Sequence, residues 1–242
     1  MYDWDKSTAL LAAQAPWWEP GTASGYHALN YGHLIGEVIR RITGLRLGEF
    51  FAAHLAGPLS ADFHIGLSPS EFHRVANVVP PPAAPAAAAE PVPLDPNSVA
   101  FKSMSNPAMT PETTWTEGWR RADIGAANGH GNARSLARLQ SAVACGGEVD
   151  GVRLLSPQTI DRIFEVQTHG IDLVIGIPTK WGLGYGLFPE GRGCAFGGYG
   201  GSLVVIDADR RMTFAYVMNK MAPGGGTIAA ALAERVSAIV KR

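Results

Sequence analysis

Apolar side chains recur at helical spacing between Asn30 and Gly44, and this pattern predicts a helix that is buried along one face. The stripe consists of Leu34, Ile35, Val38, Ile39 and Ile42. The Asn30 side chain can accept hydrogen bonds from the first free backbone N–H groups, and Gly44 stands where a C-terminal glycine cap belongs. Tyr26 therefore lies just before a buried helix, in a turn that Pro20-Gly21 opens.

Helical patterns recur elsewhere in the chain, mostly before residue 170. We predict further helices over Trp4–Gln14, Leu47–Leu55, Ala133–Ala144, Pro157–Glu165 and Gly226–Lys241. In the first of these we expect Leu10 and Leu11 to face inward. The final helix carries its apolar side chains on one shared face: Ile228, Leu232, Val236 and Ile239.

Strand patterns dominate the sequence from about Ile171 onward. The predicted strands there are Trp181–Phe188, Ala195–Asp207 and Arg211–Lys220, the last two joined by a tight turn at Asp207–Arg210. Earlier segments are predicted as a short strand at Phe63–Leu67, a polar loop at Asn106–Arg121, a turn at Asn128–Asn132 and a small hairpin at Val149–Leu154. The fold class is therefore α+β, with a mainly helical region over 1–170 and antiparallel strands with a final helix over 171–242.

The composition changes between Val79 and Pro96, where proline and alanine dominate. Proline removes backbone donors, so this tract cannot hold a normal helix or a central strand. We interpret 79–96 as an extended surface excursion, and disorder is an equally good interpretation.

The composition excludes several function classes. The chain has 242 residues, 46% hydrophobic and 17% charged, with a net charge of −1, so there is no electrostatic case for nucleic acid or an anionic membrane. No apolar run of about 18 residues predicts a membrane span, and no signal peptide is evident. Cys145 and Cys194 lack CxxC spacing and are expected to be free, buried thiols in a reducing, cytoplasmic compartment. The seven histidines show no i, i+4 pair, so no metal site and no cofactor is expected.

Tyr26 is the first candidate for chemistry, because the helix after it gives the phenol a rigid support. A buried hydroxyl bonded to backbone is the commoner fate of a tyrosine, and both interpretations stay open from the residues alone. His27 beside it is a candidate pocket-lining group, and His130 in a glycine-rich turn is a second, although a structural role is the commoner one for each.

A glycine-rich run, Phe196–Ser202, is the second candidate, with four glycines among residues 197–201. Glycines allow a substrate to approach the backbone, whose exposed N–H groups can stabilise an oxyanion. A β-bulge or a closely packed strand would use the same residues. We expect Phe196, Gly197, Gly198 and Tyr199 to lie on one strand that walls a substrate site.

The segment from Pro20-Gly21-Thr22 through Tyr26 to the helix with Gly32 and Gly36 resembles the tyrosine motif of the serine β-lactamase and penicillin-binding-protein superfamily. The resemblance is to its class C-like branch, which includes the family VIII carboxylesterases, and the stretch from Gly129 to Ser135 resembles the same branch. Ala28 stands where class C enzymes have asparagine, which favours the esterase-like relatives. The resemblance implies a β-lactamase-like fold, a small ester or amide substrate, acyl transfer through an acyl-serine, a proton-transfer role for Tyr26 and a substrate-binding role for Phe196–Gly198.

The nucleophile motif of that superfamily, Ser-x-x-Lys, is absent, because no serine in the sequence has lysine three residues later. The resemblance therefore covers the later two-thirds of such an enzyme, and we expect its N-terminal strands and nucleophile helix to be missing. Three interpretations stay open: a truncated serine hydrolase that is inactive alone, a non-catalytic binding protein, and a fragment without independent function.

Overall fold

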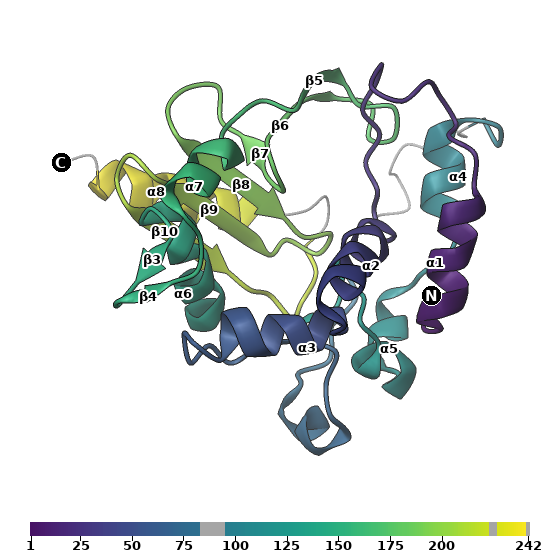
Figure 1. Cartoon of the computed structure of the whole chain (residues 1–242), viewed down its shortest axis with the longest axis horizontal. Coiled ribbons are helices and arrows are strands. Elements are labelled where there is room, and N and C mark those ends of the chain that lie inside the picture. The colour runs from purple at the N-terminus through teal and green to yellow at the C-terminus, as the bar shows by residue number, and fades with distance from the viewer. Residues whose placement is uncertain (83–94, 223–226, 241–242) are drawn as a thin grey trace.

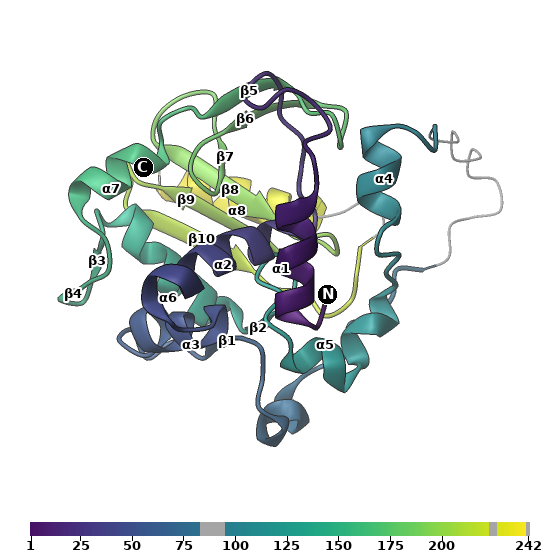
Figure 2. The same cartoon turned by 45° about the vertical axis from the view of Figure 1, so that its right-hand side comes forward.

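The computed structural model describes residues 1–82, 95–222 and 227–240 (Figure 1). A six-stranded sheet with its covering helices forms one part, and a second set of helices forms the other (Figures 1 and 2). The fold is α+β, as expected from the sequence. Most of the 79–96 tract lies outside the described residues, and the division into regions at residue 170 stays a prediction.

The sheet is an antiparallel meander in the order β10-β9-β8-β7-β6-β5. Its strands are Thr168–Ile171 (β5), Pro178–Trp181 (β6), Gly186–Leu187 (β7), Gly193–Gly197 (β8), Leu203–Asp207 (β9) and Met212–Tyr216 (β10). Each strand follows its neighbour along the chain, so every connection is a hairpin. The longest pairings join β8 to β9 and β9 to β10.

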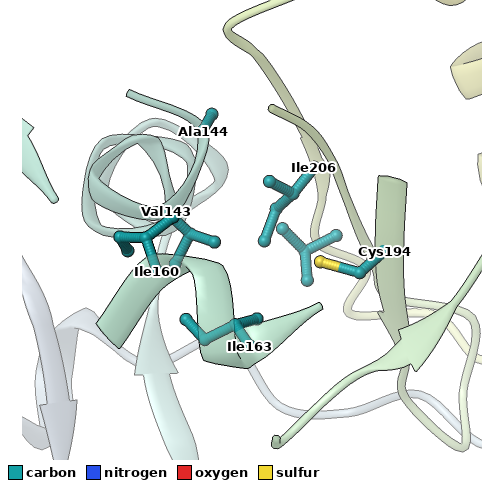
Figure 3. Close-up of a cluster of buried hydrophobic side chains, with 7 residues drawn as sticks. Val143, Ala144, Ile160, Ile163, Cys194 and Ile206 are labelled. Atoms are coloured by element: carbon teal, nitrogen blue, oxygen red, sulfur yellow. The ribbon is translucent and has the colours of Figure 1, made fainter. Parts of the chain in front are cut away.

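Helices cover both faces of this sheet. Ala133–Ala144 (α6) and Pro157–Ile163 (α7) lie on one face, and Thr227–Val240 (α8) lies on the other (Figures 1 and 2). Figure 3 shows the core on the α6 side, where side chains of α6 and α7 meet those of β8 and β9. The buried members of this cluster are Val143, Ala144, Ile160, Ile163, Cys194, Val204 and Ile206.

The helical part surrounds a small two-stranded sheet. Its helices are Trp4–Ala13 (α1), Tyr31–Thr43 (α2), Leu47–Phe51 (α3) with a π-helical continuation Ala52–Ala56, Val99–Ser105 (α4) and Glu117–Arg121 (α5); Pro69–Arg74 and Pro111–Trp115 are 3-10 helices. Phe63–Ile65 (β1) pairs with Gly129–Gly131 (β2). A separate hairpin joins Glu148–Val149 (β3) to Val152–Arg153 (β4).

The predicted helices are confirmed, but the prediction of which face of α2 is buried is wrong. Its buried residues are Gly32, His33 and Gly36, whereas the apolar stripe that includes Val38 and Ile42 is exposed. Gly36 allows this packing, because an added Cβ would lie 2.5 Å from the Trp4 ring. The first turn also differs, since the Asn30 side chain caps no helical N–H.

The same inversion occurs in α8 and α1. Ala229 and Ala233 are the buried residues of α8, and its predicted apolar face is largely exposed, with Ile239 at 71%. In α1, Thr8 is buried and Leu10 is exposed. In α2 and α8 most of the buried residues are small, and several larger apolar side chains are exposed. The contact between α1 and α2 also includes the stacked rings of Trp4 and His33.

Several predicted strands and loops also differ from the structure. The segment Trp181–Phe188 forms two paired strands, because Gly182 and Gly184 make a turn between them. The segment Ala195–Asp207 likewise splits into β8 and β9. The turn predicted at 128–132 contains β2, and the loop at 106–121 contains a 3-10 helix and α5, whose Trp119 is buried.

Candidate active site

Three aromatic rings in a row connect Tyr26 with the glycine-rich segment. The Tyr26 ring stacks on Trp181 of β6, with ring centroids 6.3 Å apart and an interplanar angle of 17°. Trp181 in turn lies 6.3 Å from the ring of Phe196 on β8. Gly186 on β7 lies between these two strands and has no side chain to separate the rings. Tyr26 and Phe196 thus belong to one surface of the molecule, although they come from distant parts of the sequence.

A buried carboxylate fixes the Tyr26 segment to the sheet. Asp172, which directly follows β5, is fully buried. Its Oδ1 accepts a hydrogen bond from the Tyr26 backbone N–H at 3.0 Å, and its Oδ2 accepts one from the Ser24 hydroxyl at 3.0 Å. The N–H groups of Val174 and Ile175 also donate to Oδ1. The chain before α2 therefore crosses to the β5–β6 hairpin, as Figure 2 shows.

The ionised form of Asp172 suits this position. Burial by itself raises the pKa of the carboxyl, but three backbone N–H groups and one hydroxyl stabilise its charge, and the pKa lies below the ordinary 3.8. A charged, fully hydrogen-bonded group is a rigid anchor. Asp172 thus acts on Tyr26 by positioning its backbone.

The Tyr26 hydroxyl is half-buried and forms no hydrogen bond with the described residues. The structural interpretation of Tyr26, in which the hydroxyl bonds to backbone, is therefore not what the described residues show. Burial raises the pKa of Tyr26 above its ordinary value of 10.0, so the phenol is protonated at neutral pH. A neutral phenol of this kind can donate a proton or a hydrogen bond to a reacting group.

The glycine-rich run forms a turn between two strands, which corrects the expectation of a single strand. Phe196 and Gly197 end β8, and β9 begins at Leu203. The Gly198 N–H donates to the Ser202 carbonyl at 2.7 Å and is thereby occupied. Hydrogen-bonded pairs alternate along an antiparallel ladder, so the Gly197 N–H points away from β9 and toward β7. The Gly197 N–H is therefore not used in the pairing of β8 with β9.

The two remaining candidates lie on exposed backbone. Tyr199, at the tip of the β8–β9 turn, is 92% exposed. His27 is exposed and its Nδ1 lies 2.9 Å from the Asn30 side-chain oxygen. His27 and Tyr26 both line a cavity of about 770 Å³, and residues of α1 and α4 form part of its wall.

Metal-ligating clusters and membrane-long apolar helices are not found in the described part of the chain. No group of three or more metal-ligating side chains converges among the described residues. None of the described helices has the length and apolar character needed to cross a membrane. Cys145 and Cys194 are both free, but only Cys194 is buried; the expectation of two buried thiols is wrong for half-buried Cys145.

Sequence reasoning missed Asp172 and gave Trp181 no role in the site. Each had a weak signal. Asp172 is the one charged residue in the apolar run from Ile171 to Pro178, and a lone carboxylate in such a run is one that needs partners. Trp181 precedes the glycines of the β6–β7 turn, but nothing in the sequence indicates that its ring meets Tyr26.

Comparison with known proteins identifies relatives over nearly the whole chain. The model of the family described as Beta-lactamase matches residues 1–238. Esterase/beta-lactamase LipL of Mycobacterium tuberculosis is 33% identical over 208 residues, which are 82% of this chain and 48% of that protein. The solved structure of a family VIII carboxylesterase is 38% identical with a TM-score of 0.80, covering 91% of this chain and 59% of that one. EstA of Arthrobacter nitroguajacolicus Rue61a is 30% identical with a TM-score of 0.81, covering 98% and 66%.

The chain spans about half the length of the curated relative, 48%, and about three-fifths of the family VIII carboxylesterase, 59%. These relatives therefore contain a substantial stretch of polypeptide that has no counterpart in this sequence.

Proposed function

Because the chain belongs to the beta-lactamase family of serine hydrolases, we propose that it forms the proton-transfer and acyl-binding part of a class C-like carboxylesterase. The reaction is hydrolysis of a small ester or amide through an acyl-serine. The observation that carries this proposal is the ring row from Tyr26 through Trp181 to Phe196, which brings the tyrosine motif and the glycine turn to one surface.

Each candidate residue has a role in this proposal. Tyr26 assists proton transfer to and from the serine oxygen and the leaving group. The Gly197 N–H stabilises the oxyanion of the tetrahedral intermediate. The Phe196 ring, 37% exposed, contacts the substrate, and His27 lines the approach to Tyr26. Asp172 positions Tyr26 without contacting the substrate.

The nucleophile of this reaction comes from polypeptide outside this sequence. The sequence contains no Ser-x-x-Lys, and its relatives are longer by the stretch noted above. A segment that supplies Ser-x-x-Lys would complete the site, and the lysine would assist deprotonation of the serine. Two free thiols suit a reducing compartment, so we place this protein in the cytoplasm.

The first experiment compares the chain alone with the chain joined to the Ser-x-x-Lys segment of the family VIII carboxylesterase. The chain alone should hydrolyse p-nitrophenyl esters about 10⁶-fold more slowly than the completed protein, which is the usual cost of losing a nucleophile. Labelling of a serine in the lone chain by a fluorophosphonate, with turnover lost on mutation of that serine, would contradict the proposal.

The second experiment tests Tyr26 in the completed protein. Tyr26→Phe should lower kcat by about 10²–10⁴, the usual contribution of a positioned proton-transfer group. Tyr31→Phe is the matched control, because Tyr31 is an exposed tyrosine at the start of α2 and should keep full activity. Equal activity of both variants would contradict the proton-transfer role of Tyr26.

A further inference from the structure

The glycine turn, residues 198–202, connects β8 to β9 and has an exposed front and a buried rear. Gly197 and Tyr199 are exposed, whereas Gly200 and Gly201 are buried. The front is where the proposed oxyanion donor lies. Its position therefore depends on the contacts that hold the rear of the turn.

Residues 218–222, which follow β10, form a support segment behind this turn. The Ala222 N–H donates to the Gly200 carbonyl at 3.0 Å. The Met218 N–H donates to the Ser202 hydroxyl oxygen at 3.2 Å. Two hydrogen bonds therefore join the turn to the support segment, beyond the ladder that pairs β9 with β10.

The side chains of the support segment also contact Gly200 closely. A Cβ added to Gly200 would clash with Met218 Cε and would lie 3.0 Å from Met218 Sδ and 2.9 Å from Met221 Cγ. The φ angle of Gly200 is not positive, so its backbone does not by itself require glycine. Met218 thus occupies the space that a side chain at residue 200 would need.

The support segment is itself held by Val79. The Val79 N–H donates to the Asn219 carbonyl at 2.6 Å, and the Met221 N–H donates to the Val79 carbonyl at 2.9 Å. These bonds make a parallel bridge between Val79 and Lys220. The turn therefore rests on backbone whose own position is fixed by hydrogen bonds.

We propose that Ser202 and Met218 are positioning residues, which hold the glycine turn on the support segment and thereby fix the direction of the Gly197 N–H. This inference rests on the proposed function for the role of Gly197 as oxyanion donor. Such a donor is effective because it is preorganised, and a misplacement of about 1 Å can cost about 10²-fold in rate. Ser202 and Met218 act through the turn and not on the substrate.

The first test uses the chain alone and needs no turnover. Hydrogen exchange of the Ala222 amide, followed by NMR, reports whether the Gly200 carbonyl stays in place. Ser202→Ala removes the acceptor of the Met218 N–H and should speed this exchange about tenfold, as expected for the loss of one hydrogen bond. Ser202→Thr keeps the hydroxyl and should restore protection, whereas Ser141→Ala, which removes a half-buried hydroxyl from α6, should change nothing. Unchanged exchange in Ser202→Ala would overturn the proposal.

A double-mutant cycle tests Met218, and serves if Ser202→Ala fails to fold. Gly200→Ala should speed exchange of the same amide, because the new Cβ displaces Met218. In the Met218→Ala background this effect should be at least about fivefold smaller, since the clashing methyl group and sulfur are gone. Met104→Ala, an exposed methionine on α4, should not reduce it. Additive effects of Gly200→Ala and Met218→Ala would contradict the role of Met218.

The catalytic measurement uses the completed protein and p-nitrophenyl esters. Ser202→Ala should lower kcat about 10–100-fold and leave KM within about twofold, because an oxyanion donor acts in the transition state. Ser202→Thr should recover kcat. A purely structural role would lower the amount of folded enzyme and not the kcat of what remains, so an unchanged kcat in Ser202→Ala would also overturn the proposal.

The outcomes separate this inference from the proposed function. If the Ala222 amide responds as expected and the completed protein hydrolyses no ester, the proposed function fails and the support of the turn by Ser202 and Met218 stands. If the completed protein hydrolyses these esters and Ser202→Ala keeps the native kcat, the hydrolase stands and the positioning role fails.

Discussion

Asp172 is the residue on which the position of Tyr26 depends. It holds four hydrogen-bond donors, two of them from the Tyr26 segment and two from its own hairpin. A buried donor that loses its acceptor costs more than the bond itself contributes, because it cannot regain water. Position and stability are therefore coupled at this carboxylate.

Asp172→Asn should lower the free energy of unfolding by about 2–3 kcal/mol. The asparagine side chain has no charge, and its NH₂ group would face donors that Asp172 now accepts from. Chemical denaturation at pH 7 measures this. Asp161→Asn is the matched control, because Asp161 pairs with Arg192 on the exposed surface and should cost less than about 1 kcal/mol. A loss at Asp172 as small as that at Asp161 would contradict the role of anchor.

The same carboxylate should make the stability of the chain fall at acidic pH. The folded-state pKa of Asp172 is lower than the ordinary 3.8, so its stabilisation is complete above that value and is lost as the pH falls through the folded pKa. Between pH 5 and pH 2 the native chain should lose more stability than Asp172→Asn does. Parallel acid profiles for the two proteins would rule this out.

Cys194 should make the chain less stable at high pH, whereas Asp172 makes it less stable at low pH. The thiol is fully buried in the core of Figure 3, and burial raises its pKa from the ordinary 9.0 to about 12. The contribution of the neutral thiol to stability is complete below pH 9. It is lost as the pH rises from 9 toward 12, at about 1.4 kcal/mol per pH unit. Cys194→Ala should start from lower stability at pH 8 and decline less steeply between pH 9 and pH 10.5, which denaturation at each pH would show.

At the scale of elements, the helices α2 and α8 pack through small residues and expose their larger apolar ones. Gly32 and Gly36 let α2 approach its neighbours closely, and Ala229 and Ala233 do the same for α8. A helix face that contacts nothing within the described chain contributes little to folding. The outward faces should therefore tolerate changes that an ordinary amphipathic helix would not.

Ile42→Lys should change the free energy of unfolding by no more than about 0.5 kcal/mol, because Ile42 is 78% exposed. Ile206→Ala in the core should cost about 2–5 kcal/mol in the same assay. A loss above about 2 kcal/mol at Ile42 would show that this face is covered in solution.

These helices also show how far sequence reasoning reaches. Periodicity and caps placed α6, α7 and the β3–β4 hairpin nearly to the residue, because they depend on local spacing and on caps such as Ser156. The inward face of α2 could not be found in this way, because it depends on which neighbours are present. Tyr26, Phe196 and Gly197 were recognised through local motifs, whereas Trp181 and Asp172 act through contacts between distant segments.

At the scale of the whole molecule, the six-stranded sheet has two edge strands among the described residues, β5 and β10. Strand β10 pairs with β9, and no described strand pairs with its other edge. Helix α8 packs on the sheet through Ala229 and Ala233 and exposes its larger apolar side chains, with Ile228 59% and Ile239 71% exposed. Unpaired edges next to apolar surface favour association between chains.

The isolated chain should therefore associate as its concentration rises. Sedimentation velocity at about 1–100 µM measures this, because chains with exposed apolar surface and unpaired strand edges aggregate at micromolar concentrations. The double variant Ile228→Glu with Ile239→Glu should lower the average mass, because it puts charge on the exposed face. Arg235→Gln, also exposed on α8, is the control and should not. A monodisperse, cooperatively melting native monomer would count against the open edge.

The hydrogen bond between Asp172 and the Tyr26 N–H also bears on the order of folding, because it spans 146 residues of sequence. The meander of β5–β10 closes through hairpins between neighbours, which form quickly, whereas so distant a contact must wait for a large loop to close. Trp181 stacks on Tyr26 only after that closure, so its fluorescence should reach the native value later than the far-ultraviolet circular dichroism of the sheet. The proposed active site would then be the last part of the chain to become native.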